Sequence, residues 1–392
     1  MRMFLTGNEA AAYGARLARP QVIAAYPITP QSPIYVKLSE WDGKGILGAR
    51  MMRVESEHSA MAACIAASLT GVRTFTATAS QGLALMHEML HYASGMRVPI
   101  VMVNVNRSLA APWSFWSDQT DSLAQRDTGW LQFYVADNQE ALDTVIQAYS
   151  ISETVLLPSM VVMEAFYTSH FSEPVEVPDQ ETVDAFLPAF EPEFFLNPQK
   201  PATFCQTVTQ SQYAEFKLLR QTAMDNALEA VEAVNKKFKE HFGRQYHLLN
   251  CYHNNDAEIV LVTAGTIGST ARVVIEELRA AGKKVGLVRI RLFRPFPKTA
   301  LIDSLRHTKK IAVIDRNISP GQEGVFSEEL KSVLFSRIQD IPVFSFVLGL
   351  GGSNVSPRHI KKIIEITTNM KDAPLNPIAN LEDDNAIRIK QQ

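Results

Sequence analysis

The stretch Ala25-Tyr26-Pro27-Ile28-Thr29-Pro30 decides how the first part of this chain folds. It closes an apolar, strand-like run that begins at Gln21, and its prolines bracket a rigid turn with the hydroxyl of Thr29 at the tip. A second run, Val54-Glu55-Ser56-Glu57-His58-Ser59-Ala60, follows about one helix later and places an acid at the start of a helix of small residues. A strand, a rigid turn and a helix with an acid in its first turn predict an α/β unit. Such a unit carries polar groups just beyond the end of a strand.

Strand and helix patterns alternate on both sides of this stretch, with short turns between them. In the first ~170 residues we predict strands at 22–26, 51–54, 73–79, 99–106 and 156–164, with helices at 9–17, 30–41, 58–69, 83–92 and 139–154. The same rhythm returns with strands at 258–264, 285–289, 310–315 and 343–347, and helices at 269–281, 301–305, 323–337 and 357–366. It predicts parallel sheets with helices on both faces.

A proline-rich segment separates the two alternating parts. It reads as an extended connector followed by a helix over 213–241, which at about 1.5 Å per residue spans about 40 Å and suits a spacer better than a core element. The expected organisation is therefore an α/β domain, a connector with a long helix, a second α/β domain and a polar tail. The predicted limits are 1–172, 173–255, 256–370 and 371–392.

Composition excludes several classes of function. The net charge of −3 gives no reason to expect nucleic acid or a membrane surface as a partner, and no apolar run is long enough to span a bilayer. The first residues lack the pattern of a signal peptide, so a cytoplasmic location is expected. Cys64, Cys205 and Cys251 are far apart and form no CxxC pair, so we expect no disulfide and no metal or iron–sulfur site in this chain. Cys64 is expected to be a small core residue.

The glycine turns are not nucleotide-binding motifs. Gly265-x-x-Gly268 and Gly349-x-Gly351-Gly352 each follow a predicted strand, but neither has the GxGxxG spacing of a dinucleotide site. We interpret both as ordinary turns between strand and helix.

Several polar residues follow the predicted ends of parallel strands, where ligands bind in open α/β sheets. Thr29, Arg107 and the run Ser80-Gln81-Gly82 all fall there, and an arginine with a hydroxyl suits a carboxylate ligand. Glu57 by itself is explained by the preference for an acid in the first turn of a helix, and Glu55 is a rival acid.

Six motifs together resemble the alpha subunit of the pyruvate:ferredoxin oxidoreductase (pyruvate synthase) family. The resemblance runs from about residue 5 to about residue 366. It rests on Tyr26–Pro30, Ser56-Glu57, Thr78–Gly82, Asn106–Ala110, Gln125–Trp130 and Asp315–Gly324. It implies a pyrimidine-type thiamine-diphosphate-binding fold, followed by a domain like the C-terminal domain of transketolase.

The resemblance also assigns roles to residues. Glu57 would be the acid beside N1′ of the thiamine diphosphate pyrimidine, where it promotes removal of the proton from the thiazolium ring. Thr29 and Arg107 would hold the carboxylate of a 2-oxoacid. Contacts to the cofactor would come from Ile28, Ser80, Gln81 and Gly82. The alanine-rich helix after Glu57 would let a second subunit pack close and keep the acid dry.

The implied reaction is the reversible, CoA-dependent oxidative decarboxylation of a 2-oxoacid, with electrons passing through iron–sulfur clusters to ferredoxin or flavodoxin in anaerobic metabolism. The Gly-Asp-Gly motif that binds diphosphate and Mg²⁺ does not occur in this sequence, and neither do cluster cysteines. The resemblance therefore implies beta, gamma and delta partner subunits that carry Mg²⁺ and the [4Fe-4S] clusters. This chain alone is expected to be inactive.

The identity of the 2-oxoacid depends on the stretch Pro112–Asp121, which is bulkier than in many alpha subunits and follows Arg107. Pyruvate is the favoured substrate, and a branched-chain acid such as 2-oxoisovalerate is the alternative. The 2-oxoglutarate branch usually carries Ser-Gly-Pro-Gly where this chain has Ser80-Gln81-Gly82, and Thr29 argues against the oxalate branch. Another thiamine-enzyme subunit and a non-catalytic scaffold stay open as further hypotheses.

Overall fold

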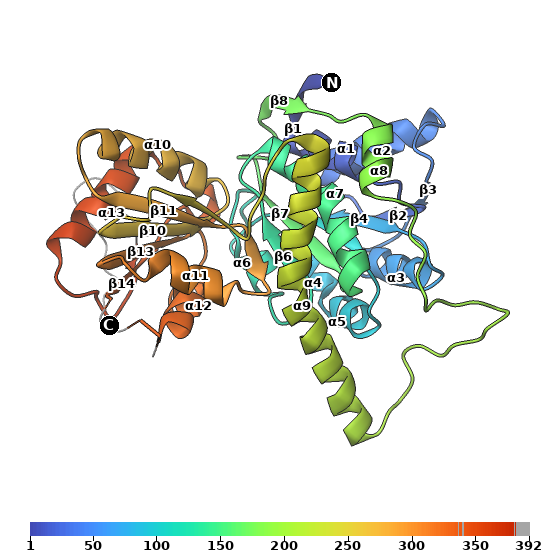
Figure 1. Cartoon of the computed structure of the whole chain (residues 1–392). Helices are drawn as coiled ribbons and strands as arrows, with labels where there is room; N and C mark the ends of the chain where they lie inside the picture. Colours follow the sequence, from blue (N-terminus) through green and yellow to red (C-terminus); the bar gives the residue numbers. More distant parts are fainter. Residues whose placement is uncertain (336, 339–340, 380, 382–392) are drawn as a thin grey trace.

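The computed structural model describes residues 1–335, 337–338, 341–379 and 381. Two α/β lobes lie side by side, each around its own sheet (Figure 1). The N-terminal lobe has a seven-stranded sheet in the order β12-β6-β7-β5-β4-β2-β3. In chain order its strands are β2 (Val22–Ala25), β3 (Arg50–Arg53), β4 (Thr74–Thr78), β5 (Val101–Asn106), β6 (Leu131–Tyr134), β7 (Ser159–Glu164) and β12 (Leu292–Arg294).

The order of these strands creates a switch point in the sheet. The chain passes from β2 to β3 on one side and then returns to place β4 on the other side of β2. All neighbouring strands from β3 to β6 run parallel. The crevice beyond the carboxyl ends of β2 and β4 is the place where such sheets bind ligands.

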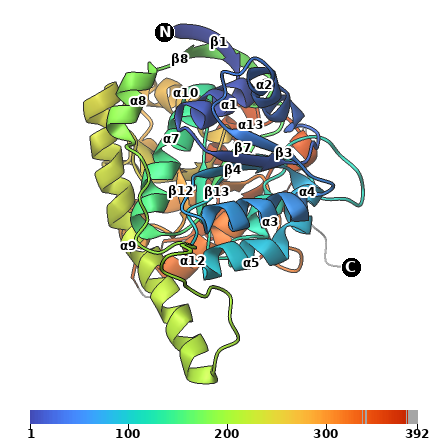
Figure 2. The same cartoon turned by 90° about the vertical axis from the view of Figure 1, so that its right-hand side faces the viewer.

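Helices cover both faces of this sheet, as the alternating sequence predicted (Figure 2). One layer holds α1, α2 and α7, and the other holds α3, α4 and α5. Their bounds are α1 (Gly7–Leu17), α2 (Ser32–Gly43), α3 (Glu57–Ser68), α4 (Ser80–Leu85), α5 (His87–Gly95), α6 (Thr120–Leu123) and α7 (Asn138–Val155). The single helix predicted over 83–92 was wrong in its limits, because two short helices meet at Met86.

Small residues decide how closely these layers approach. Along α1 the alanines at positions 10, 11, 12 and 15 are fully buried against the rest of the lobe. Cys64 on α3 is also fully buried, and its thiol donates to the carbonyl oxygen of Phe75 at 3.5 Å. The prediction that Cys64 is a core residue is therefore confirmed.

The connector is more structured than its prolines suggested. Its first part forms β8 (Ser172–Glu176), which pairs antiparallel with β1 (Arg2–Thr6), and α8 (Gln180–Phe186). The long helix α9 (Gln210–Phe242) begins with a capping box at Thr209 and ends at Gly243 in the left-handed conformation. From Ala223 onward one side of α9 is buried against the N-terminal lobe, so this part of the helix is a core element and not a spacer.

The C-terminal lobe has a six-stranded sheet in the order β15-β14-β13-β10-β11-β9. Its elements are β9 (Leu249–Tyr252), β10 (Ile259–Ala264), α10 (Ile267–Ala280), β11 (Val285–Ile290), α11 (Lys298–Leu305), β13 (Lys310–Asp315), α12 (Val325–Leu334), β14 (Val343–Val347), a short 3-10 turn (Leu350–Gly352), α13 (Pro357–Asn369) and β15 (Ile378–Ala379). The sequence did not predict β15, which lies in the expected tail; residues 380 and 382–392 of that tail lie outside the described residues. The residue limits expected for the domains stay predictions.

The two lobes are joined by backbone pairing and by buried charges. β12 leaves the C-terminal part of the chain and pairs antiparallel with β6 of the N-terminal lobe. Beside it, the carboxylate of Glu140 on α7 forms ion pairs with the guanidinium groups of Arg289, at 3.0 Å, and Arg291, at 2.9 Å. All three side chains are buried. Among the residues that the structure describes, no helix is both long enough and apolar enough to cross a lipid bilayer.

Candidate functional site

Three strand ends meet at the switch point, and Arg107 connects them. Arg107 follows β5, is 3% exposed, and donates from Nη1 to the carbonyl oxygen of Thr29 at 2.6 Å. Its Nη2 donates to Oε1 of Gln81, which follows β4. The arginine contacts the backbone of Thr29 and leaves the exposed side chain of that residue free to face a ligand.

Glu57 is the buried acid of this region. It is the first residue of α3, which Ser56 caps by accepting the backbone N–H of Ser59 at 3.2 Å. The Glu57 side chain is 6% exposed. Burial raises the pKa of Glu57, against the opposing effect of its own backbone N–H and the charge of Arg107. A buried carboxyl group with a raised pKa is suited to share a hydrogen bond with a ring nitrogen.

Gly82 is the reason that the Glu57 carboxylate can reach the end of β4. A Cβ atom on Gly82 would lie 2.5 Å from Oε1 of Glu57 and 2.5 Å from Oγ1 of Thr78. Any larger residue would displace the acid. The Ser80-Gln81-Gly82 turn therefore contributes space as well as hydrogen-bonding groups.

The rival acid, Glu55, has a different environment. It is exposed and accepts a hydrogen bond from the hydroxyl of Ser59 in its own turn. That hydrogen bond lowers the pKa of Glu55, so the group stays ionised in solvent. Of the two acids, only Glu57 is buried beside Arg107.

Buried polar atoms without a partner surround this site. They are Oγ1 of Thr78, Nε2 of Gln81 and Nε of Arg107. A buried donor or acceptor that stays unpaired is costly, so these atoms are available to a ligand. The set of one buried acid, one arginine and one free amide suits an aminopyrimidine beside Glu57 and a carboxylate beside Arg107.

The remaining predicted residues line the same corner. Ile28 is half-buried and packs against the core, and its backbone N–H donates to Oε1 of Gln31 at 3.4 Å. Ser80 is fully buried, with a φ of 50° in the left-handed region. Its hydroxyl lies 2.6 Å from the carbonyl oxygen of Ser108 and 2.6 Å from Oε1 of Gln81.

Aromatic side chains stand over Arg107. The guanidinium carbon lies 6.0 Å from the centre of the Trp113 ring and 5.4 Å from that of Phe115. These rings belong to the bulky stretch after Arg107. They place apolar surface where the organic part of a bound acid would lie.

Both lobes hold this aromatic stretch in place. The Trp116 ring packs on Phe166 with centroids 4.6 Å apart. Tyr167 donates its hydroxyl to the carbonyl oxygen of Gly352 at 2.8 Å, and the backbone N–H of Gln119 donates to the carbonyl oxygen of Arg316 at 3.0 Å. The glycine turn at 349–352 therefore serves packing between the lobes, in agreement with its interpretation as an ordinary turn.

Sequence reasoning missed one residue at the centre of this network. Asp121 on α6 is 1% exposed, and its carboxylate accepts the backbone N–H of Ser80 at 2.9 Å and that of Arg107 at 3.1 Å. The indication in the sequence was the pair Asn104 and Asn106 in an otherwise apolar strand. Both amide groups point to the carboxylate of Asp121.

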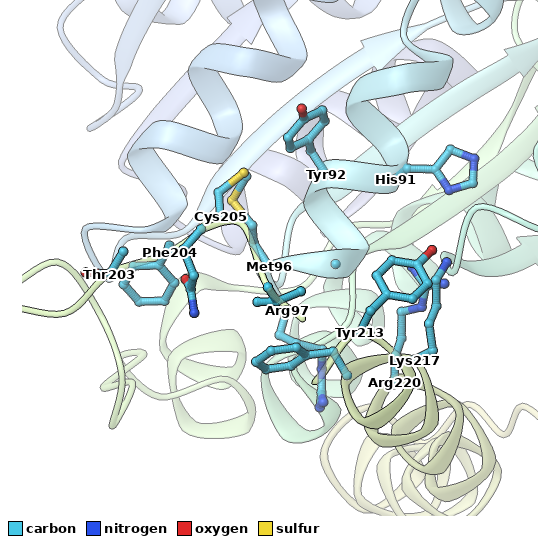
Figure 3. A pocket seen from close by; sticks show the side chains of 14 residues that line it. His91, Tyr92, Met96, Arg97, Thr203, Phe204, Cys205, Tyr213, Lys217 and Arg220 are labelled. Carbon is cyan, nitrogen blue, oxygen red and sulfur yellow. The ribbon is translucent and has the colours of Figure 1, made fainter. Parts of the chain in front are cut away.

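A cavity lies away from Glu57 and Arg107, between α5, the connector and the exposed start of α9 (Figure 3). Its volume is about 580 Å³, and its walls include His91, Tyr92, Phe204, Tyr213 and Lys217. None of the predicted site residues lines it. Within the part of the chain that the structure describes, no three His, Cys, Asp or Glu side chains are grouped as metal ligands.

Comparisons with known proteins identify the family to which the chain belongs. A family model described as pyruvate flavodoxin/ferredoxin oxidoreductase, thiamine diphosphate-binding, matches residues 13–236. A second model, pyruvate:ferredoxin oxidoreductase core domain II, matches residues 257–360.

Two curated relatives match nearly the whole chain. Pyruvate synthase subunit PorA of Methanothermobacter thermautotrophicus is 47% identical over 367 residues, which are 93% of this chain and 95% of the relative. Ketoisovalerate oxidoreductase subunit VorA of Pyrococcus horikoshii is also 47% identical over 367 residues, 93% of each chain. The chain therefore belongs to the pyruvate flavodoxin/ferredoxin oxidoreductase family, as its motifs predicted. Within it, the chain is the alpha subunit of a 2-oxoacid:ferredoxin oxidoreductase, an enzyme complex.

Two solved structures share the fold. A chain of 2-oxoglutarate:ferredoxin oxidoreductase from Magnetococcus marinus superposes with a TM-score of 0.74 at 17% identity, covering 93% of this chain and 65% of that chain. A split gene transketolase superposes with a TM-score of 0.56 at 14% identity, covering 94% of this chain and 99% of that chain. At these identities the likeness concerns the fold alone. The predicted fold class, a thiamine-diphosphate-binding domain with a transketolase-like second domain, is confirmed.

Proposed function

We propose that this subunit supplies the pyrimidine-side acid and the 2-oxoacid carboxylate site of a complex that converts pyruvate and CoA reversibly to acetyl-CoA and CO₂, with electrons passing to ferredoxin. The observation that carries the proposal is the meeting of three strand ends, where buried Glu57 stands beside Gly82 and Arg107 bridges Thr29 and Gln81. Names of the 47% identical relatives support the same reaction class.

Each residue has a defined task in this proposal. When bound, thiamine diphosphate would supply the nucleophilic carbon that attacks a keto group and accepts the electrons released with CO₂. Glu57, whose pKa is raised by burial, forms a hydrogen bond with N1′ of the pyrimidine. Arg107 pairs with the carboxylate of the 2-oxoacid, and the free Nε2 of Gln81 is a further donor toward it. The hydroxyl of Thr29 completes the carboxylate site, while Ile28, Ser80 and Gly82 shape the space for the cofactor.

Partner subunits complete the enzyme in this proposal. Beta, gamma and delta subunits supply the diphosphate and Mg²⁺ site and the [4Fe-4S] clusters, because this sequence lacks their motifs. The alanine-rich face of α3 next to Glu57 is where a partner would shield the acid from water. Without partners the chain is inactive, and the complex works in the cytoplasm.

Pyruvate is proposed as the substrate because a relative that is 47% identical over most of this chain is a pyruvate synthase subunit. Trp113 and Phe115 lie beside the arginine that would hold the carboxylate, so they are where a choice between 2-oxoacids would be made. The branched-chain alternative stands because a ketoisovalerate relative is as similar as a pyruvate relative. Sequence identity therefore does not separate the two acids.

The deciding experiment is to purify the native complex through this chain and assay 2-oxoacid- and CoA-dependent viologen reduction. Pyruvate, 2-oxoisovalerate and 2-oxoglutarate are compared, and bound thiamine and iron are measured in the same sample. Reduction that is fastest with pyruvate supports the proposal. A preference for 2-oxoisovalerate supports the alternative, and no reduction with any acid contradicts both.

A further inference from the structure

The carboxylate of Asp121 occupies a position that the proposed reaction does not explain. Five donors surround it: the backbone N–H groups of Ser80, Arg107 and Ser122, and the side-chain amides of Asn104 and Asn106. Asp121 touches neither Glu57 nor the side-chain nitrogens of Arg107 through any of these bonds. Its bonds to Ser80 and Arg107 go to the backbone just beyond the ends of β4 and β5.

Those two strand ends carry the groups that face the ligand. Ser80 begins the turn that holds Gln81 and Gly82, and Arg107 is the first residue after β5. One oxygen of Asp121 accepts from Ser80 at 2.9 Å, from Arg107 at 3.1 Å and from Asn104 at 3.2 Å. A single atom therefore fixes the spacing between the two segments. Without it, two buried N–H groups would lose their acceptor.

We propose that Asp121 is a positioning residue for the 2-oxoacid site, whose carboxylate ties Ser80 to Arg107 and thereby sets where the Arg107 guanidinium meets Gln81. The inference rests on the proposed function, in which Arg107 binds the carboxylate of the substrate. A shift of a binding group by about 1 Å can cost a large factor in enzyme efficiency, so this tie has a measurable effect.

The ionisation of Asp121 provides a readout that packing alone would not. Burial raises the pKa of Asp121 to about 6, although the five donors favour the charged form. Below that pH the carboxyl group gains a proton. The protonated oxygen then points a hydrogen at one of the surrounding N–H donors, so a hydrogen bond at that position is lost. The elements packed most closely against α6 are α4 and β5, which carry no Asp, Glu, Lys, Arg or His, and β6 adds the hydroxyl of Tyr134.

Other titratable groups around Asp121 do not share this behaviour. Arg107 stays charged, although burial lowers its pKa, because the charges of Asp121 and Glu57 oppose that shift. Burial raises the pKa of Tyr134, whose hydroxyl lies 2.8 Å from Oγ of Ser122, so this group stays neutral. Glu57 is unchanged in the Asp121, Asn104 and Asp315 variants, so any pH dependence that it contributes is common to all of them.

The test uses the purified complex and the viologen assay, with KM measured for pyruvate and for CoA from pH 5 to pH 8. Asp121→Asn is expected to raise KM for pyruvate about tenfold at pH 7, with kcat changed by less than about threefold and KM for CoA unchanged. In the wild type KM for pyruvate is expected to rise as pH falls below about 6, and Asp121→Asn is expected to lack that rise.

Asp315→Asn is the matched control. Asp315 is fully buried in the C-terminal lobe, accepts from Phe326, Ser327 and Asn317, and has its pKa raised by burial to about 6 as well. The variant removes the same charge, but the carboxylate bonds only to the segments 317 and 326–327 of the C-terminal lobe and to neither segment that carries Gln81 or Arg107, so KM for pyruvate is expected to stay unchanged. An equal rise in both variants would reduce Asp121 to a general structural role and overturn the proposal.

A second variant covers the case in which Asp121→Asn does not assemble. Asn104→Ala removes one donor from the same oxygen and is expected to raise KM for pyruvate about threefold. An unchanged KM in Asn104→Ala together with a flat wild-type pH profile would overturn the inference. Turnover without these effects defeats only the positioning role, whereas a wild-type complex that reduces no viologen with any 2-oxoacid defeats the proposed function and this inference together.

Discussion

Glu57 and Glu55 stand two residues apart in the sequence and in opposite environments. Glu57 is buried beside Gly82, and burial raises its pKa, whereas Glu55 is exposed and bound to Ser59. Their chemistry differs because α3 begins at Glu57, which turns that side chain inward and leaves Glu55 in the preceding turn. The pair therefore supplies a test at the scale of one residue.

We expect Glu57→Gln to lower turnover of the assembled complex by about 100-fold or more, since an amide cannot exchange a proton with the cofactor pyrimidine. Glu55→Gln is the matched control and is expected to keep wild-type turnover. The measurement is 2-oxoacid-dependent viologen reduction, with subunit content checked by gel filtration. Wild-type turnover in Glu57→Gln would remove Glu57 from the mechanism.

Arg107 gives a second test at the same scale. Because it is 3% exposed and its Nε has no partner, its truncation should leave a carboxylate ligand without its counter-charge. Arg107→Ala is expected to raise KM for the 2-oxoacid about 100-fold and KM for CoA less than about threefold. Steady-state kinetics with each substrate varied in turn would check this. Equal increases in both constants would contradict carboxylate binding.

The element that most constrains the site is the turn from β4 into α4. Gly82→Ala places a Cβ 2.5 Å from both Glu57 and Thr78, so we expect overpacking to cost about 1–3 kcal/mol and to displace the acid. Gly95→Ala, in the last turn of α5, is the control, because no atom from elsewhere in the chain lies within 4 Å of its Cβ. That change is expected to stabilise the helix by about 0.5–1 kcal/mol.

Thermal unfolding and turnover of the two glycine variants would be compared in the complex. Gly82→Ala should lose both stability and turnover, whereas Gly95→Ala should lose neither. If Gly82→Ala kept full turnover, the close approach of Glu57 to this turn would have no catalytic importance.

Elements with strong periodicity were predictable, and those defined by distant partners were not. The strands at 22–25 and 101–106 and the helix of small residues after Glu57 follow from local pattern. β6 and β12 are short: β6 pairs with β7, and β12 is added to β6 from about 160 residues further along the chain, a contact that no local pattern indicates.

The residues of the candidate site likewise divide into those that local sequence predicts and those that depend on distant partners. Arg107 and the 80–82 turn were found because parallel strands end at one edge of a sheet. Asp121 was missed because its partners outside its own helix lie in two other segments, at Ser80 and at 104–107, and a four-residue helix offers no periodicity to read. What the sequence lacked was the spatial neighbourhood that makes this aspartate different from an exposed one.

At the scale of the whole molecule, the buried cluster of Glu140, Arg289 and Arg291 explains why the lobes hold together. Burial acts to raise the pKa of Glu140, but the charges of Arg289 and Arg291 outweigh burial and lower it. A lowered pKa means that the ionised acid stabilises the fold above its unfolded pKa. This contribution disappears as pH falls through the folded pKa of Glu140, which lies below its unfolded value.

We expect Glu140→Gln to destabilise the junction of the lobes by about 3–5 kcal/mol at pH 7, because two buried arginines lose their counter-charge. The effect should concentrate where the chain beside β12 meets β6, so amide hydrogen exchange at Tyr134, whose N–H donates to the carbonyl oxygen of Arg291 at 2.7 Å, should accelerate about 100-fold or more. Glu176→Gln is the control, because its carboxylate is 68% exposed and pairs with Arg244 at 3.3 Å, which is worth at most about 1 kcal/mol. Unchanged exchange in Glu140→Gln would mean that backbone pairing and apolar contacts alone join the lobes. Acceleration confined to β6 and β12 would show that the ion cluster holds the second lobe against the first, and with it the aromatic stretch that stands over Arg107.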